Sequence, residues 1–186
     1  HADLGTAFYH PHSLIALRSI SLEGETPDAA LVSRRLHAAE AFRRRLYPGS
    51  DSWRTCHGES DGLPGLFVDR YADVFVVQSF SAGMDRLQGD VARVLTDELC
   101  ARSVVERNES HLRELEGLEA RTGLLAGEPP GRVVARLPPL ALQVEPLSGQ
   151  KTGAFLDQRE NRLAAARHAR GMRVYEAHCN TGGFAI

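Results

Sequence analysis

Residues 66–77 read LFVDRYADVFVV, two apolar runs with the short break Tyr71-Ala72-Asp73 between them. Both runs are rich in β-branched and aromatic side chains, so the stretch predicts a β-hairpin with strands at 66–70 and 74–77. A glycine-rich corner over residues 58–65 joins this hairpin to another predicted strand at 53–57. Together these runs predict a small β-sheet.

Helical spacing occurs on both sides of this sheet. Apolar residues recur at intervals of three or four between Val32 and Leu46, which predicts an amphipathic helix over residues 27–47. Thr26 is its expected N-cap, and Pro27 its first helical residue. A second helical pattern covers residues 84–101. Further short strands are expected at 6–22 (with a break at Pro11), 103–107, 132–136 and 140–145.

The last part of the chain, from residue 148, again combines a helix with a strand. A helix is predicted over residues 157–169, and a strand over 173–177 leads into the turn Asn180-Thr181-Gly182-Gly183. Strands and helices therefore interleave along the whole chain, which predicts the α/β fold class.

The composition is that of an ordinary globular protein. Of its 186 residues, 42% are hydrophobic and 25% charged, and the net charge of −2 means that nucleic-acid binding would depend on local patches. No apolar run approaches the ~18 residues that a membrane helix needs, and the N-terminus has no signal-peptide pattern. Three scattered cysteines indicate a reducing, cytoplasmic compartment. The lack of a starting methionine favours a piece of a longer polypeptide.

Two motifs with familiar chemistry are weak. Residues 149–152 (GQKT) are similar to the end of a phosphate-binding loop, but that loop needs glycine directly before lysine, and Gln150 stands there. Residues 56–61 (CHGESD) offer metal ligands, but a zinc site usually needs a second pair, which no suitable register supplies. Turn chemistry with capping carboxylates explains this segment better, so no metal is predicted.

A polar cofactor site is better supported. The turn at 180–183 follows a predicted strand, where ligands bind in open α/β sheets. Asp157 suits the positive end of the helix that follows residues 151–153, and Arg159 and Arg162 share one of its faces. Each element alone is explained as well by a simple turn or a solvated helix start. The two together favour a site.

Several motifs occur in a fixed order along the chain. They are GESDGLPGL at 58–66, VDRY at 68–71, ER at 106–107, EGL at 116–118, GQKTG at 149–153, FLDQR at 155–159 and NTGGF at 180–184. The ordered set resembles the class I S-adenosylmethionine-dependent 23S rRNA (cytosine-C5) methyltransferases, the RlmI-like family, over almost the whole chain. Two departures from the family pattern, His178-Cys179-Asn180 before TGGF and Ala154 after KTG, affect the expected donor pocket.

The resemblance implies several domains and a methyl donor. Residues 1–22 would be the end of an RNA-binding PUA domain, 23–49 a linker helix, 50–147 a central α/β domain of the α+β kind, and 148–186 the start of a Rossmann-like methyltransferase domain. It further implies S-adenosylmethionine as cofactor, ribosomal RNA as partner, and no membrane. The implied cofactor-binding residues are Lys151, Thr152, Gly153, Phe155, Asp157, Arg159, Arg162, Asn180, Thr181, Gly182, Gly183 and Phe184.

Methylation at C5 of a pyrimidine requires a nucleophile that adds to C6, usually a cysteine thiolate. The resemblance implies that this cysteine lies downstream of Ile186, because Cys56, Cys100 and Cys179 do not match it. Cys179 is expected to be a small packed residue. The chain alone is therefore expected to be inactive, as an internal fragment of the enzyme.

Contacts with RNA are expected from arginines in the first part of the chain. The candidates are Arg18, Arg34 and Arg35, together with residues 43–45 (RRR) on the same predicted helix, although a solvated helix face explains the helical ones as well. Two other functions stay open: a non-catalytic RNA-binding or interaction module and, with less weight, a nucleoside-triphosphate-binding enzyme. The oligomeric state is open too, a homodimer included.

Overall fold

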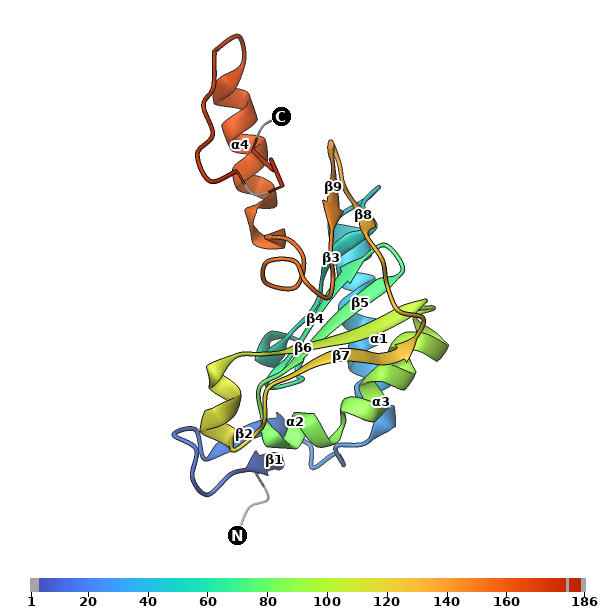
Figure 1. Ribbon diagram of the computed structural model, residues 1–186. Helices are drawn as coiled ribbons and strands as arrows, with labels where there is room; N and C mark the ends of the chain where they lie inside the picture. Colours follow the sequence, from blue (N-terminus) through green and yellow to red (C-terminus); the bar gives the residue numbers. More distant parts are fainter. Residues whose placement is uncertain (1–3, 180, 185–186) are drawn as a thin grey trace.

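The computed structural model describes residues 4–179 and 181–184, and its centre is a five-stranded mixed sheet (Figure 1). The strand order is β3-β4-β5-β6-β7, and all neighbours are antiparallel except β5 and β6. The strands are β3 (Ser52–His57), β4 (Leu66–Tyr71), β5 (Val74–Ser79), β6 (Ser103–Asn108) and β7 (Arg121–Gly127). At one end of the molecule lies α4 (Arg159–Ala169), and at the other the hairpin of β1 (Thr6–Tyr9) and β2 (Leu17–Ser21).

The predicted hairpin forms as β4 and β5. Its pairs run from Leu66 opposite Ser79 to Tyr71 opposite Val74, and Ala72 in the turn has a φ of 55°. A parallel neighbour cannot be reached by a tight turn, so the chain crosses from β5 to β6 through helices. The crossover consists of α2 (Ala82–Arg86), α3 (Gln88–Arg93) and a π-helical turn (Val94–Glu98).

This crossover corrects the prediction of a single helix over 84–101. The Ser81 hydroxyl caps α2 by accepting a hydrogen bond from the Met84 amide, and the helix ends at Leu87, where ψ is 3°. The apolar spacing continues across the break because Met84 and Val91 pack into the same core. Periodicity alone therefore could not reveal the interruption.

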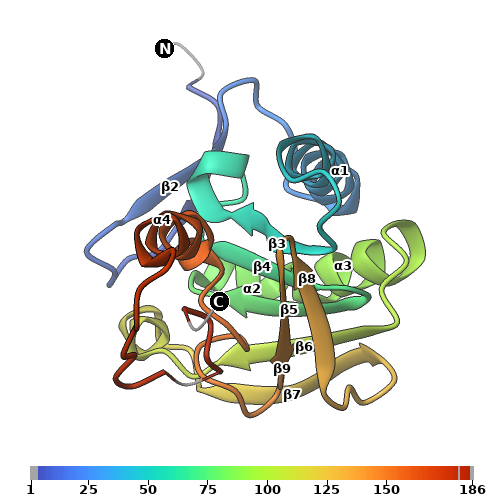
Figure 2. The same ribbon diagram turned by 90° about the horizontal axis from the view of Figure 1, so that it is seen from above.

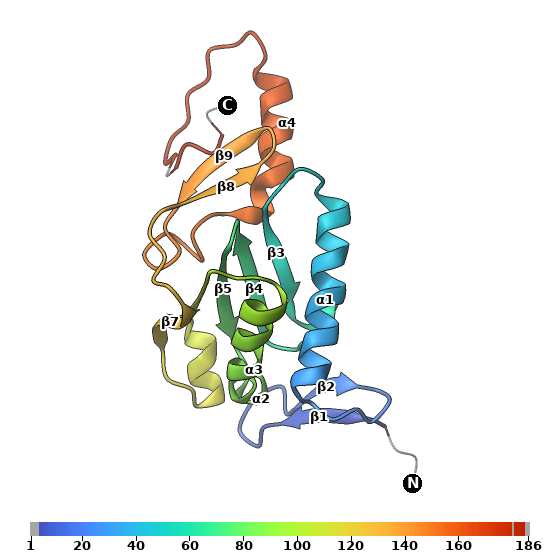
Figure 3. The ribbon, with the colours of Figure 1, turned by 90° about the vertical axis from the view of Figure 1, so that its right-hand side faces the viewer.

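One face of the sheet is covered by α1 (Ala29–Leu46) and α3, which lie side by side in Figure 3. Their apolar side chains form the larger core with β3, β4 and β5. The helix α1 begins at Asp28 and not at the predicted Thr26, because the Asp28 carboxylate accepts a hydrogen bond from the Leu31 amide at 3.0 Å. Aspartate is the stronger N-cap of the two.

The other face is covered by β8 (Val133–Leu137) and β9 (Leu140–Val144), which cross the sheet in Figure 2. This hairpin packs on Tyr71, Val76 and Val105 in a second apolar core. The sequence did not predict β7, because its two glycines and polar first residues hide the strand pattern. Pairing with β6 forms this strand.

Residues 173–177, predicted as a strand, are not in a strand. A strand needs a hydrogen-bonded neighbour, and the sheets of the described residues provide none for this segment, whose Val174 and Tyr175 are exposed. The described structure is therefore mixed α/β without the sheet of a Rossmann-like domain. None of the described helices has the length and apolar character to span a membrane.

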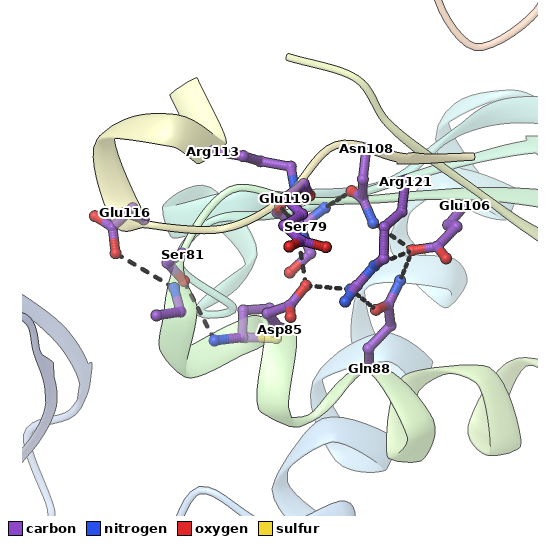
Figure 4. Close-up of polar contacts among 12 residues, drawn as sticks. Ser79, Ser81, Asp85, Gln88, Glu106, Asn108, Arg113, Glu116, Glu119 and Arg121 are labelled. Carbon is purple, nitrogen blue, oxygen red and sulfur yellow. Dashed lines mark hydrogen bonds and ion pairs between the residues drawn. The ribbon is translucent and has the colours of Figure 1, made fainter. Parts of the chain in front are cut away.

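A polar cluster joins the ends of β5, β6 and β7 to α2 and to the 3₁₀ turn His111–Glu116 (Figure 4). Arg113 is fully buried, donates to the Ser79 carbonyl and forms an ion pair with Asp85 at 2.9 Å. Glu106, quoted above in a motif, accepts hydrogen bonds from Gln88, Asn108 and Arg121. Since buried polar groups require partners, this motif residue contributes to the fold.

Candidate functional site

A buried threonine holds the loop at residues 149–153 against the sheet. The Thr152 hydroxyl donates a hydrogen bond to Oδ2 of Asp69 at 2.6 Å, and the Tyr71 hydroxyl lies 2.9 Å from the threonine oxygen. The Ala154 amide donates to the Tyr71 hydroxyl at 3.1 Å. Burial raises the pKa of Tyr71, which keeps its hydroxyl protonated. Thr152 is therefore an anchor, with its side chain directed at the sheet.

Two arginines complete the anchor. Arg54 forms a bidentate ion pair with Asp69, with N–O distances of 2.7 and 3.0 Å, and the hydrogen bond to Asp69 raises the pKa of Arg54. Arg107, buried on β6, donates from Nη1 to the carbonyls of Pro146 and Gly149, at 3.1 Å each. In the sequence, Asp69 and Arg107 stand out only as members of the VDRY and ER motifs. Their positioning role was missed because no local pattern signals contacts across such long separations.

The loop backbone adopts a shape that requires glycine. Gly153 has a φ of +138°, and a Cβ there would lie 3.3 Å from the Tyr71 ring. A Cβ on Gly149 would lie 2.6 Å from the carbonyl oxygen of Glu145. Between them, Lys151 has a φ of 55°, which costs free energy in a residue with a side chain. Protein contacts therefore define the loop shape in the absence of a ligand.

This loop borders a polar cleft of about 390 Å³. The polar cleft is lined by Arg132, Gln143, Glu145, Gly149, Gln150, Gly153 and Thr181. Thr181 belongs to the second glycine-rich element, next to Gly182 with its φ of +72°. The structure therefore brings to one cleft the two segments that the sequence predicts to form a site. Asn180, another predicted site residue, lies outside the described residues.

Arg162 lies next to the second glycine-rich element with an unsatisfied guanidinium. The residue is only 4% exposed, and its Nε and Nη1 atoms have no hydrogen-bond partner among the described residues. A Cβ on Gly183 would lie 2.8 Å from Nε, and the Phe184 ring centroid is 5.8 Å from Cζ. Burial lowers the pKa of Arg162. The carboxylates of Asp157 and Glu176 lie near enough to oppose this shift, but they form no hydrogen bond with Nε or Nη1, so two buried donors are left for an acceptor atom of a ligand.

Three other predicted cofactor residues, Lys151, Asp157 and Arg159, line a different cleft of about 330 Å³, the aromatic cleft. It lies between the C-terminal end of α1, β3 and residues 151–159, and is lined by Phe42, Arg43, Leu46, Tyr47, Ser52, Trp53, Arg54, His57, Leu137, Lys151, Ala154, Leu156, Asp157 and Arg159. Lys151 Nζ lies 4.3 Å above the Phe155 ring, and the Arg159 guanidinium 4.4 Å above the Tyr47 ring. The structure thus divides the predicted cofactor residues between two clefts.

The predicted RNA-binding arginines form ion pairs and hydrogen bonds with other residues of the chain. Arg18 lies 3.4 Å from both Glu59 and Glu116, and Arg34 pairs with Glu25. Arg35 donates to the Ile20 and Gly62 carbonyls and also pairs with Glu25. Neighbouring carboxylates compensate all three charges, so this region is a poor phosphate-binding patch.

The cysteines differ in environment. Cys56 is buried, and burial raises its pKa to about 12. Cys179 was expected to be packed but is exposed, since it lies in a segment without helix or strand. Cys100 is exposed as well. In the CHGESD turn, the Asp61 carboxylate accepts a hydrogen bond from the His57 amide at 2.7 Å, which confirms the capping interpretation. No group of three potential metal ligands is found among the described residues.

Comparison with known proteins confirms the resemblance that the motifs indicate. No protein-family model matches the chain. It is 38% identical over 184 residues to Ribosomal RNA large subunit methyltransferase I of Alteromonas mediterranea, covering 97% of this chain and 46% of the relative. The Aeromonas hydrophila protein of the same name is 40% identical over 166 residues, with 87% and 42% covered. The chain spans about half the length of the curated relatives it matches.

Solved structures agree on the fold. A putative SAM-dependent methyltransferase from Streptococcus mutans superposes with a TM-score of 0.71 at 17% identity, over 87% of this chain and 42% of that one. A putative methyltransferase complexed with SAH gives a TM-score of 0.71 at 16% identity, over 87% and 41%. The predicted α/β class is confirmed.

Proposed function

We propose that this chain is part of an S-adenosylmethionine-dependent methyltransferase that modifies ribosomal RNA, with C5 of a cytosine as its target. The observation that carries the proposal is the meeting of the anchored 149–153 loop with Thr181 at one polar cleft. Arg162, with two buried donors that form no hydrogen bond, lies against Gly183 of the same glycine-rich element. The names of the relatives and the SAH complex of the structural neighbour support this choice of donor and substrate. Ribosomal RNA as substrate places the protein in the cytoplasm.

The donor-binding surface is proposed to consist of the two glycine-rich elements and the helix between them. S-adenosylmethionine carries a carboxylate, and its sulfonium supplies an activated methyl group when it is bound. The buried Nε and Nη1 of Arg162 are donors that suit such a carboxylate. The glycines at 149 and 153 fix the loop whose backbone lines the polar cleft. Lys151, Phe155, Asp157 and Arg159, which the resemblance also implies for the donor, lie at the aromatic cleft, so the donor is not assigned to them.

The nucleophile for C5 methylation is not assigned to Cys56. Its thiol is buried, and a pKa of about 12 keeps it protonated, whereas attack at C6 requires an accessible thiolate. The role proposed for the described residues is therefore donor and RNA binding. The β1–β2 hairpin is proposed to be the end of a PUA domain and residues 50–147 a central domain, as the resemblance implies.

Titration calorimetry of the chain with SAH tests donor binding. The Arg162→Met variant should weaken SAH binding by tenfold or more, since a hydrogen bond to a charged group contributes about 1.5–3 kcal/mol. Arg167→Met, on an exposed position of the same helix, is the matched control and should bind as the unmodified chain does.

Stability separates a ligand role of Arg162 from a structural one. Methionine removes a buried charge that interacts with Asp157 and Glu176, so Arg162→Met should lower the urea midpoint if the role is structural and should lower the SAH affinity of the folded protein if the residue binds the donor. SAH binding that is unchanged in Arg162→Met would refute the donor role of this residue. A chain that binds RNA but no SAH would instead support the non-catalytic RNA-binding module.

A further inference from the structure

We propose that the aromatic cleft binds an unpaired nucleotide of single-stranded RNA, with its base against Phe42 and the adjoining phosphates on Lys151 and Arg159. The inference rests on the proposed function for the class of substrate, and it adds a binding site for that substrate. It replaces the arginines at 18, 34 and 35 as the principal RNA contacts.

Three aromatic side chains line the cleft. Phe42 is 46% exposed near the C-terminal end of α1, and Tyr47 and Trp53 line the same space. The guanidinium groups of Arg43 and Arg45 lie 5.3 and 5.8 Å from the Phe42 ring centroid, so a base would stack on this ring beside them or in their place. The Trp53 ring is nearly buried and fixed, because its Nε1 donates to Glu40 at 2.8 Å. Stacking on aromatic side chains is the usual way in which proteins hold unpaired bases, and it needs a rigid wall of this kind.

The charges of the cleft suit the RNA backbone. Arg43 and Arg54 are already neutralised by ion pairs with Asp61 and Asp69. Lys151 and Arg159, in contrast, have no carboxylate within ion-pair distance among residues 4–179 and 181–184, and both lie above aromatic rings. Two uncompensated cations at the rim of an apolar cleft form the pattern that binds phosphates beside a stacked base.

The position of the cleft agrees with a substrate role. Lys151 and Ala154 line the aromatic cleft, while Gly149, Gln150 and Gly153 of the same segment line the polar cleft. RNA and donor would therefore bind on different residues of one anchored loop. Two separate ligands are expected.

Fluorescence anisotropy measures the binding of RNA to the chain, with no S-adenosylmethionine or SAH added. The probe is a fluorescein-labelled single-stranded RNA of about twelve nucleotides and mixed sequence, and the comparison is the same RNA as a blunt duplex. Phe42→Ala should weaken binding of the single strand by about 5- to 150-fold. Phe42→Leu keeps an apolar side chain but loses the ring, so its affinity for the single strand should fall nearly as far as that of Phe42→Ala. The duplex should bind at least tenfold more weakly than the single strand.

Salt dependence distinguishes the charges from the ring. Lys151→Gln and Arg159→Gln should each reduce the slope of log K against log salt concentration by about 0.7, whereas Phe42→Ala should leave the slope unchanged. Arg93→Gln removes an exposed charge on α3, ion-paired with Asp90 and away from the cleft, and should affect neither quantity.

Three results would overturn the inference: equal binding of Phe42→Ala and the unmodified chain, equal binding of duplex and single strand, or displacement of the RNA by SAH or by a free nucleoside monophosphate at its own dissociation constant. The last result would make the cleft a site for the donor or for small nucleotides. RNA binding is measured in the absence of S-adenosylmethionine and SAH. A negative RNA-binding result therefore does not contradict the proposed SAH site, and a negative SAH titration does not contradict the proposed RNA site.

Discussion

The Thr152 hydroxyl and the Asp69 carboxylate lie 2.6 Å apart although 83 positions separate them in the sequence. Arg54 fixes the Asp69 carboxylate on the central sheet, so the hydrogen bond from Thr152 to Asp69 restricts the motion of the loop. A loop attached in this way presents its backbone to a ligand in one shape, which lowers the entropy lost on binding.

Removal of this hydroxyl should destabilise the protein. Thr152→Val removes one of the two hydrogen bonds to Oδ2 of Asp69 and one contact of the Tyr71 hydroxyl, and we expect the free energy of unfolding to fall by about 1–3 kcal/mol. Thr152→Ser keeps the hydroxyl and should lose much less. Urea denaturation measures both variants, and equal midpoints for Thr152→Val and the unmodified chain would contradict the anchor role.

The glycine at 153 should not tolerate alanine. At a φ of +138° a side chain is strained, and its Cβ would press on the Tyr71 ring, so Gly153→Ala should lower stability by about 1–3 kcal/mol. Gly89→Ala is the matched control: it lies in α3 with open space around it, and alanine there should stabilise by about 0.5–1 kcal/mol. Thermal unfolding of the two variants should therefore shift in opposite directions.

Arg35 should behave as a structural residue, unlike its neighbour. Arg35→Ala removes donors from the Ile20 and Gly62 carbonyls and should cost about 1.5–3 kcal/mol, while Arg34→Ala removes only an exposed ion pair and should cost under about 1 kcal/mol. Unfolding curves measure this difference. An Arg35→Ala variant that is fully stable but has lost RNA affinity would restore the original RNA-binding prediction.

The buried Cys56 makes stability depend on alkaline pH. Folding raises its pKa from the usual 9.0 to about 12, so the folded state retains this proton more tightly than the unfolded state. The contribution is complete below pH 9 and decreases as pH rises from 9 towards 12, by at most about 1.4 kcal/mol per pH unit.

The measurement for Cys56 is the unfolding free energy of the unmodified chain and of Cys56→Ala between about pH 7 and pH 11. The two curves should stay parallel up to pH 9 and converge above it. Parallel curves over the whole range would show that the thiol does not titrate as proposed. In the folded state, an alkylating reagent should label Cys100 and Cys179 before Cys56.

The sequence predicted the elements whose signal is local. The β4–β5 hairpin follows from its alternating apolar runs, and α1 from its periodicity, although Asp28 and not Thr26 caps it. β7 was missed because it depends on pairing with β6, and the 173–177 strand failed for lack of a partner among the described strands.

The candidate site shows the same division. The motifs singled out the loop at 149–153, and the helical spacing singled out Arg162, but neither could show that Thr152 faces the sheet or that Lys151 and Arg159 line another cleft. The aromatic cleft joins α1, β3 and the loop, which are distant in sequence. Such a site depends on tertiary packing, which no single segment encodes.

The loop at 149–153 forms part of the wall of both clefts, so their occupants cannot be independent if either one shifts it. Thermodynamic linkage then requires reciprocity: whatever factor RNA applies to the affinity for the donor, the donor applies to the affinity for RNA. The affinity of the protein for each of the two ligands would thereby depend on whether the other ligand is bound. Because the loop is anchored to the sheet, a ligand that displaces it at one cleft also displaces its residues at the other cleft.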